Sequence, residues 1–83
     1  MAVLLQRIKQ QEIVGDIPSG PIDGSNISFM ASNHFLPDTL KVFYNGQRLT
    51  SGPSNDYVAT SPLVNLSFSP VPGDVILFDY LKM

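Results

Sequence analysis

The chain has 83 residues, of which 43% are hydrophobic and 14% charged, and its formal net charge is −2. This length corresponds to one small domain, and so apolar a composition excludes an intrinsically disordered chain. There is no cysteine and only one histidine, so the sequence indicates neither a disulfide nor a structural metal, and no cofactor is expected. Association with other subunits is the remaining way to stabilise a domain of this size.

The basic residues do not form a cluster. The five Lys and Arg side chains are scattered over the chain, whereas nucleic-acid binding requires clusters that neutralise phosphates. The apolar run Val3–Leu5 is too short for a signal peptide, and no stretch approaches the ~20 apolar residues that span a bilayer. The sequence therefore predicts a protein made soluble in a cytoplasm that binds neither nucleic acid nor membrane.

Residues 1–16 are predicted to form an N-terminal arm. Its apolar side chains are those of Val3, Leu4, Leu5 and Ile8. Their spacing fits about one helical turn, but no N-capping side chain precedes them and Ile13-Val14 favours an extended backbone. A short helix and an extended strand both remain open. In either case these side chains are too apolar for a free tail, so we expect them to bind a partner, which could be another copy of the chain.

Residues 17–83 are predicted to form an all-β domain. Turn-forming residues recur about every 8–12 residues, and the runs between them alternate apolar and polar side chains as half-buried strands do. The residues expected in turns are Asp23, Gly24, Asn45, Gly46, Gly73 and Asp74. Asn45-Gly46 follows the clearest strand, Thr39–Tyr44, and is the dipeptide typical of a type I′ hairpin turn. About six or seven short strands predict a small antiparallel β-sandwich or open barrel.

The alternation also predicts which side chains form the core. The expected core residues are Phe29, Leu40, Val42, Leu66, Phe68, Ile76 and Phe78. The same alternation places Leu63, Val75 and Leu77 on the outward faces of their strands. That is more exposed apolar surface than a monomer normally carries, and it indicates a second contact surface.

No catalytic or metal site is predicted. His34 lies in a loop, and neither Ser32 nor Ser61 stands in the Gly-x-Ser-x-Gly turn that presents a nucleophile. Oxygen atoms that calcium could use occur at Asp23, Asn26, Asn55 and Asp56. These four lack the EF-hand spacing and are equally expected as turn formers. The sequence therefore predicts that the chain is not an enzyme.

Most aromatic side chains fall on the core face of a predicted strand, and Phe35 and Phe43 are the two expected to be exposed. An exposed aromatic ring could stack on a sugar, but it more often marks a protein contact. The candidate partner-binding residues are Val3, Leu4, Leu5, Ile8, Phe35 and Phe43.

Several motifs follow one another in order along residues 17–81. They are Pro18-Ser19-Gly20-Pro21-Ile22-Asp23-Gly24-Ser25-Asn26 with Phe29, then Leu40-Lys41-Val42-Phe43-Tyr44-Asn45-Gly46-Gln47-Arg48-Leu49, then Asn55-Asp56-Tyr57, then Pro70 with Gly73-Asp74-Val75-Ile76 and Phe78-Asp79-Tyr80. Together they resemble a small β-module of tailed-bacteriophage virion proteins, which occurs in decoration (cement) proteins, neck and tail components and tail fibres. Each motif alone is merely a turn, and the order carries the resemblance.

The resemblance and the composition together imply a structural virion protein that is made in the host cytoplasm and located in the virion. Such a capsid decoration or cement protein, or neck or tail component, would bind other virion proteins in many copies or as a homo-oligomer. The alternative is a carbohydrate- or receptor-binding module of a tail fibre. A chain of 83 residues that starts with Met, with no fibre shaft or catalytic domain attached, favours the first function.

Overall fold

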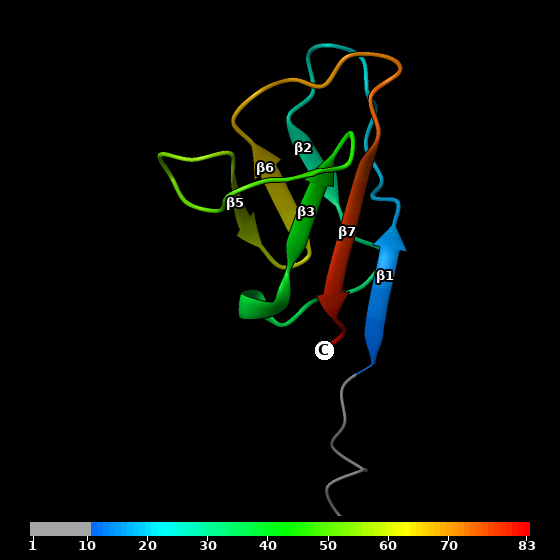
Figure 1. The fold of residues 1–83 in the computed structure, drawn as a ribbon, viewed down its shortest axis with the longest axis vertical. Helices are drawn as coiled ribbons and strands as arrows, with labels where there is room; N and C mark the ends of the chain where they lie inside the picture. The colour runs from blue at the N-terminus through cyan, green and yellow to red at the C-terminus, as the bar shows by residue number, and fades with distance from the viewer. Residues whose placement is uncertain (1–10) are drawn as a thin grey trace, which may run out of the picture.

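The computed structural model describes residues 11–83, and within them the fold is all-β. The strands are β1 (Glu12–Asp16), β2 (Ser28–Met30), β3 (Lys41–Tyr44), β4 (Gln47–Arg48), β5 (Tyr57–Thr60), β6 (Leu63–Leu66) and β7 (Ile76–Leu81). A short 3-10 turn, η1 (Pro37–Thr39), precedes β3. The strands form a four-stranded sheet in the order β1-β7-β3-β4 and a three-stranded sheet in the order β2-β6-β5 (Figure 1). All paired strands are antiparallel, so the predicted fold class is confirmed.

Strand β7 lies inside the larger sheet, with β3 on one side and β1 on the other. Its residues alternate strictly: Ile76, Phe78 and Tyr80 are buried, whereas the residues between them are half-buried. Because successive side chains of a strand point to opposite faces, the first set faces the other sheet. The second set, which includes Leu77, forms the outer face.

The core lies between the inner faces of the two sheets and includes almost all the residues predicted for it. Those that are buried as expected are Phe29, Leu40, Val42, Leu66, Ile76 and Phe78. Phe68 is only half-buried. It lies beyond the end of β6, where its ring packs edge-on against that of Tyr44 with centroids 4.8 Å apart.

The prediction that Phe35 is exposed is wrong, because its side chain is only 1% exposed. Its backbone N–H donates to the Ser61 hydroxyl at 2.8 Å, and its ring centroid is 5.7 Å from that of Tyr80. The loop that carries Phe35 forms a bridge with Lys82, just beyond the end of β7. A large side chain there closes the end of the core. Phe43, by contrast, is half-buried on the outer face, opposite Leu77.

The predicted boundary between arm and domain at residues 16 and 17 needs correction. Glu12–Asp16 form β1, an edge strand paired with β7, so the domain begins at least as early as Glu12. Of the two conformations left open for the arm, the extended one is correct for this part. Val3, Leu4, Leu5 and Ile8 lie outside the described residues, and we call residues 1–10 the N-terminal segment.

The predicted turns adopt the expected backbone. Asn45 and Gly46 join β3 to β4 with φ of 50° and 83°, and positive φ at both central residues is the signature of a type I′ turn. Gly24 and Gly73 also have positive φ, 85° and 101°.

Replacing Gly46 by valine should destabilise the domain by about 1–2 kcal/mol, because a side chain with a Cβ is strained at positive φ. A Cβ at this position would meet no atom within 4 Å, so the loss would come from the backbone alone. Urea denaturation measures it, with Gln47→Val on the neighbouring exposed strand as control. Equal stabilities of the two variants would contradict the turn.

Replacing the fully buried Phe78 by alanine should cost about 3–5 kcal/mol, which approaches the whole stability of a domain this small. Leu77→Ala, one residue away on the outer face, should cost clearly less. Measuring the free energy of unfolding of both variants tests this prediction. If Leu77→Ala proved the more damaging, the inner and outer faces of β7 would be reversed.

Candidate functional site

An apolar groove lies at the corner where the chain passes from the larger sheet to the smaller one. After β1, residues 17–22 cross to β2, where Ser19 and Met30 exchange backbone hydrogen bonds of 2.8 and 2.9 Å. The start of β7 forms the opposite wall. The groove has a volume of about 220 Å³. Its apolar lining comes from Ile17, Pro18, Ile22, Phe29, Val75, Ile76 and Leu77.

Two of the apolar side chains that line this groove are strongly exposed. Ile17 is 76% exposed and Val75 is 51% exposed. Val75 is thus exposed as predicted, and Leu63 and Leu77, which were also predicted to face outward, are half-buried. Single exposed apolar residues are ordinary, but these two flank a depression, which makes the groove a candidate contact site.

The Asp16 carboxylate fixes the wall formed by residues 17–22. It accepts hydrogen bonds from the Ser32 backbone N–H at 2.9 Å, the Ser32 hydroxyl at 2.6 Å and the Tyr80 hydroxyl at 2.8 Å. Ser32 lies just beyond β2 and Tyr80 lies in β7. One side chain at the end of β1 therefore ties together both sheets.

The Asp74 carboxylate fixes the opposite wall. It accepts hydrogen bonds from the Tyr44 hydroxyl at 2.5 Å, the Asn45 side-chain amide at 3.0 Å and the Val71 backbone N–H at 2.9 Å. Asn45 in turn accepts from the Val75 N–H at 2.7 Å. The type I′ turn is thus bound to the start of β7, which holds Val75 at the groove.

Asp23 stabilises the loop that follows Ile22 of the groove wall. Its carboxylate accepts from the backbone N–H groups of Ser25 and Asn26, both at 2.9 Å, which is an Asx turn. Just before it, Gly20 has φ of 138°, and a Cβ there would lie 2.9 Å from the Phe29 ring. Only glycine lets this segment pack directly against the core.

All three carboxylates have a lowered pKa. For Asp16, burial acts to raise the pKa, but the hydrogen bonds from Ser32 and Tyr80 outweigh it. For Asp74, the hydrogen bond from Tyr44 is the largest cause, and the same bond raises the pKa of the Tyr44 hydroxyl. Backbone hydrogen bonds from Ser25 and Asn26 lower that of Asp23. The surroundings of the groove are therefore negatively charged at neutral pH.

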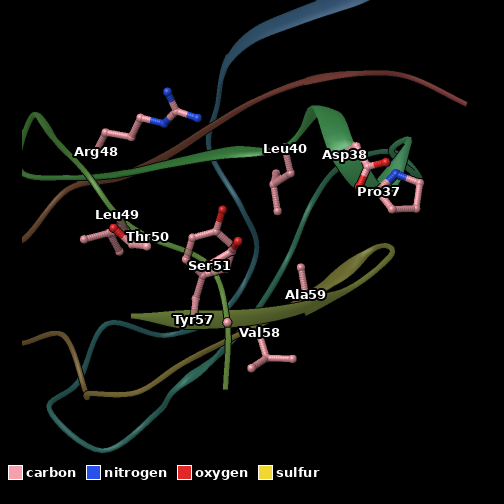
Figure 2. Close-up of a pocket in the computed structure, with 11 residues that line it drawn as sticks. Pro37, Asp38, Leu40, Arg48, Leu49, Thr50, Ser51, Tyr57, Val58 and Ala59 are labelled. Carbon is pink, nitrogen blue, oxygen red and sulfur yellow. The ribbon is translucent and has the colours of Figure 1, made fainter. Parts of the chain in front are cut away.

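A larger hollow of about 650 Å³ opens between β4 and β5, on the side where neither sheet has a further strand. Figure 2 shows Leu40 and Ala59 pointing toward each other across it, while Arg48 lies at its edge. Its aromatic residue, Tyr57, is 5% exposed, and burial raises the pKa of its hydroxyl. The ring therefore presents no open face on which a sugar could stack.

The serines considered as nucleophiles have structural partners. His34 Nδ1 lies 3.4 Å from the Ser61 hydroxyl oxygen, but that oxygen accepts the Phe35 N–H and so anchors the loop. Ser32 donates its hydroxyl to Asp16. Both hydroxyl groups therefore form hydrogen bonds that stabilise the fold.

The residues considered for calcium fall into two separate turns. Asp23 and Asn26 share the Asx turn, whereas Asp56 accepts the Thr50 N–H at 2.8 Å and Asn55 donates to the Ser51 carbonyl. In residues 11–83 no group of three or more His, Asp or Glu side chains is arranged to hold a metal ion. No helix within this part of the chain has the length and hydropathy to cross a membrane.

Comparisons of the chain with protein-family models, curated proteins and solved structures find no match. The sequence alone had pointed to Phe35, Phe43 and the apolar residues of the N-terminal segment as binding residues, and neither Phe35 nor Phe43 lines the groove. It missed Ile17 and Ile22, because the groove joins segments more than 50 residues apart in the chain. The one available signal was the prediction of an outward-facing Val75.

Stability below neutral pH tests the role of Asp16. A carboxyl with a lowered folded-state pKa stabilises the fold above its unfolded pKa, and this contribution disappears as the pH falls through the folded value. Asp16→Asn should therefore be less stable than the natural chain at pH 7, and the difference should shrink below about pH 4.

Thermal denaturation between neutral and acidic pH measures the effect, and Ser32→Ala provides a second test because it removes one donor to the same carboxylate. A stability difference for Asp16→Asn that stayed constant with pH would show that the Asp16 charge is not involved.

Proposed function

We propose that this chain is a structural protein of a tailed-bacteriophage virion, a capsid decoration protein or a neck or tail component, which binds other virion proteins in many copies. The order of the motifs along residues 17–81 supports this proposal through the resemblance described above. The all-β fold is compatible with it, and assembly offers such a small domain the stabilisation that it cannot obtain from disulfides.

The observation that carries the proposal is the apolar groove with its exposed rim. Burying Ile17 and Val75, which are 76% and 51% exposed, would contribute favourable free energy at about 25 cal/mol per Å² of apolar surface. The hydrogen bonds of Asp16, Asp23 and Asp74 hold the walls in place before any partner binds. A preformed surface loses little conformational entropy on binding, as suits a repeated contact in an assembly.

Binding of a glycan remains the second function considered for the chain, but the observations support it less. A sugar platform needs an exposed aromatic face. The ring in the large hollow is buried, and Phe43 is half-buried opposite Leu77. An apolar protein surface suits these positions better.

Mass spectrometry of purified particles tests the proposed function. We expect the chain in particles of the phage or prophage that encodes it, at a copy number comparable to that of the other structural proteins. A non-structural protein of the same genome, removed by the same purification, serves as control. Presence in infected cells with absence from intact particles would overturn the proposal.

A further inference from the structure

We propose that the apolar groove binds the N-terminal segment, residues 1–10, of a second copy of the chain. This inference rests on the proposed function, assembly in many copies, and names one contact within it. The occupant would place its apolar side chains against Ile17, Ile22 and Val75. Size, charge and chain direction each support this occupant.

The N-terminal segment has the composition that the groove requires. The groove is lined almost entirely by apolar side chains, and four of the ten residues of the segment, Val3, Leu4, Leu5 and Ile8, are large and aliphatic. These side chains are small enough to enter a volume of about 220 Å³.

The charges of the two parts are complementary. All seven acidic residues of the chain lie in residues 11–83, whereas the N-terminal segment carries Arg7 and Lys9 and no acid. Asp74 lines the groove, and Asp16 and Asp23 adjoin its wall. The basic residues of the domain lie elsewhere: Lys41 in β3, Arg48 in β4 and Lys82 after β7. The positive charges of the N-terminal segment are therefore attracted to the acidic surroundings of the groove.

The direction of the chain favours binding of the segment to the groove of a second copy over binding to the groove of its own chain. β1 runs from Glu12, opposite Leu81, to Asp16, opposite Phe78. The groove lies beyond Asp16, whereas the N-terminal segment joins β1 at the far end, where Gln11 accepts a hydrogen bond from Lys82. To reach its own groove the segment would have to reverse direction and run back along β1.

The residues just before β1 are not those that typically form a tight reversal of the chain. Tight turns between antiparallel strands use Gly, Asn, Asp or Pro, and Lys9-Gln10-Gln11 contains none of them. A second copy needs no reversal, because its segment can approach from outside. The exchange can then be reciprocal or can continue from copy to copy.

Cysteine cross-linking of the purified full-length chain tests this contact, and the natural absence of cysteine gives a clean background. We would mix isotope-labelled Ile8→Cys protein with unlabelled Val75→Cys protein, cross-link them with a short bismaleimide, and identify the products by mass. Ser54→Cys, in an exposed loop away from the groove, replaces Val75→Cys in the control. The expected main product is the mixed dimer of Ile8→Cys with Val75→Cys.

Three results would overturn the inference: equal cross-linking to Ser54→Cys, dimers formed mainly between two Ile8→Cys chains, or a double variant Ile8→Cys/Val75→Cys that links only within one chain. A matched pair of variants in the N-terminal segment adds a test that leaves the domain itself unchanged. Leu5→Asp should abolish the oligomer in light scattering, whereas Gln6→Asp, with the same change of charge, should retain it. Should Leu5→Asp remain oligomeric, the segment is not the occupant.

The results of these tests distinguish failure of this contact from failure of the proposed function. A chain found in virions whose segment fails to cross-link would leave the function standing and remove the contact. A chain that exchanges segments but is absent from particles would remove the proposed function and leave the contact between copies.

Discussion

Phe78 is fully buried at the centre of β7, the strand that joins β1 to the rest of the larger sheet and faces the smaller sheet with its inner side chains. With no cysteine in the chain, packing between these two inner faces is the main source of stability, and a core of this size supplies only about 3–5 kcal/mol. The exposed apolar groups beside so small a core are the surface that our proposed assembly would bury.

The position of the apolar groove follows from this packing. Because β1 pairs with β7 while the next segment bridges to β2, the chain must cross between the sheets, and the crossing leaves a depression beside the start of β7. Asp16 and Asp74 fix its two sides through hydrogen bonds from Tyr80 and Tyr44. These hydrogen bonds form the groove within a single chain, so in the assembly that we propose the loss of conformational entropy on binding would fall mainly on the occupant.

The sequence predicted what depends on local pattern and missed what depends on distant contacts. Alternation in β3 and β7 and the Asn45-Gly46 dipeptide identified the strands, the hairpin and most of the core. Phe35 was misplaced because a loop has no periodicity from which burial can be inferred. β1 was assigned to the arm because its partner, β7, lies at the other end of the chain. The groove could not be predicted for the same reason, since Ile17 and Val75 meet only in the folded domain.

Our central proposal is that the apolar groove is buried between copies of the chain in a virion, and a high-resolution reconstruction of the proposed particle tests it most directly. Our account predicts density packed against Ile17, Ile22 and Val75 of each copy that traces to residues 3–8 of a neighbouring copy. A reconstruction in which every copy leaves this groove open to solvent, and makes its contacts through another face, would contradict it.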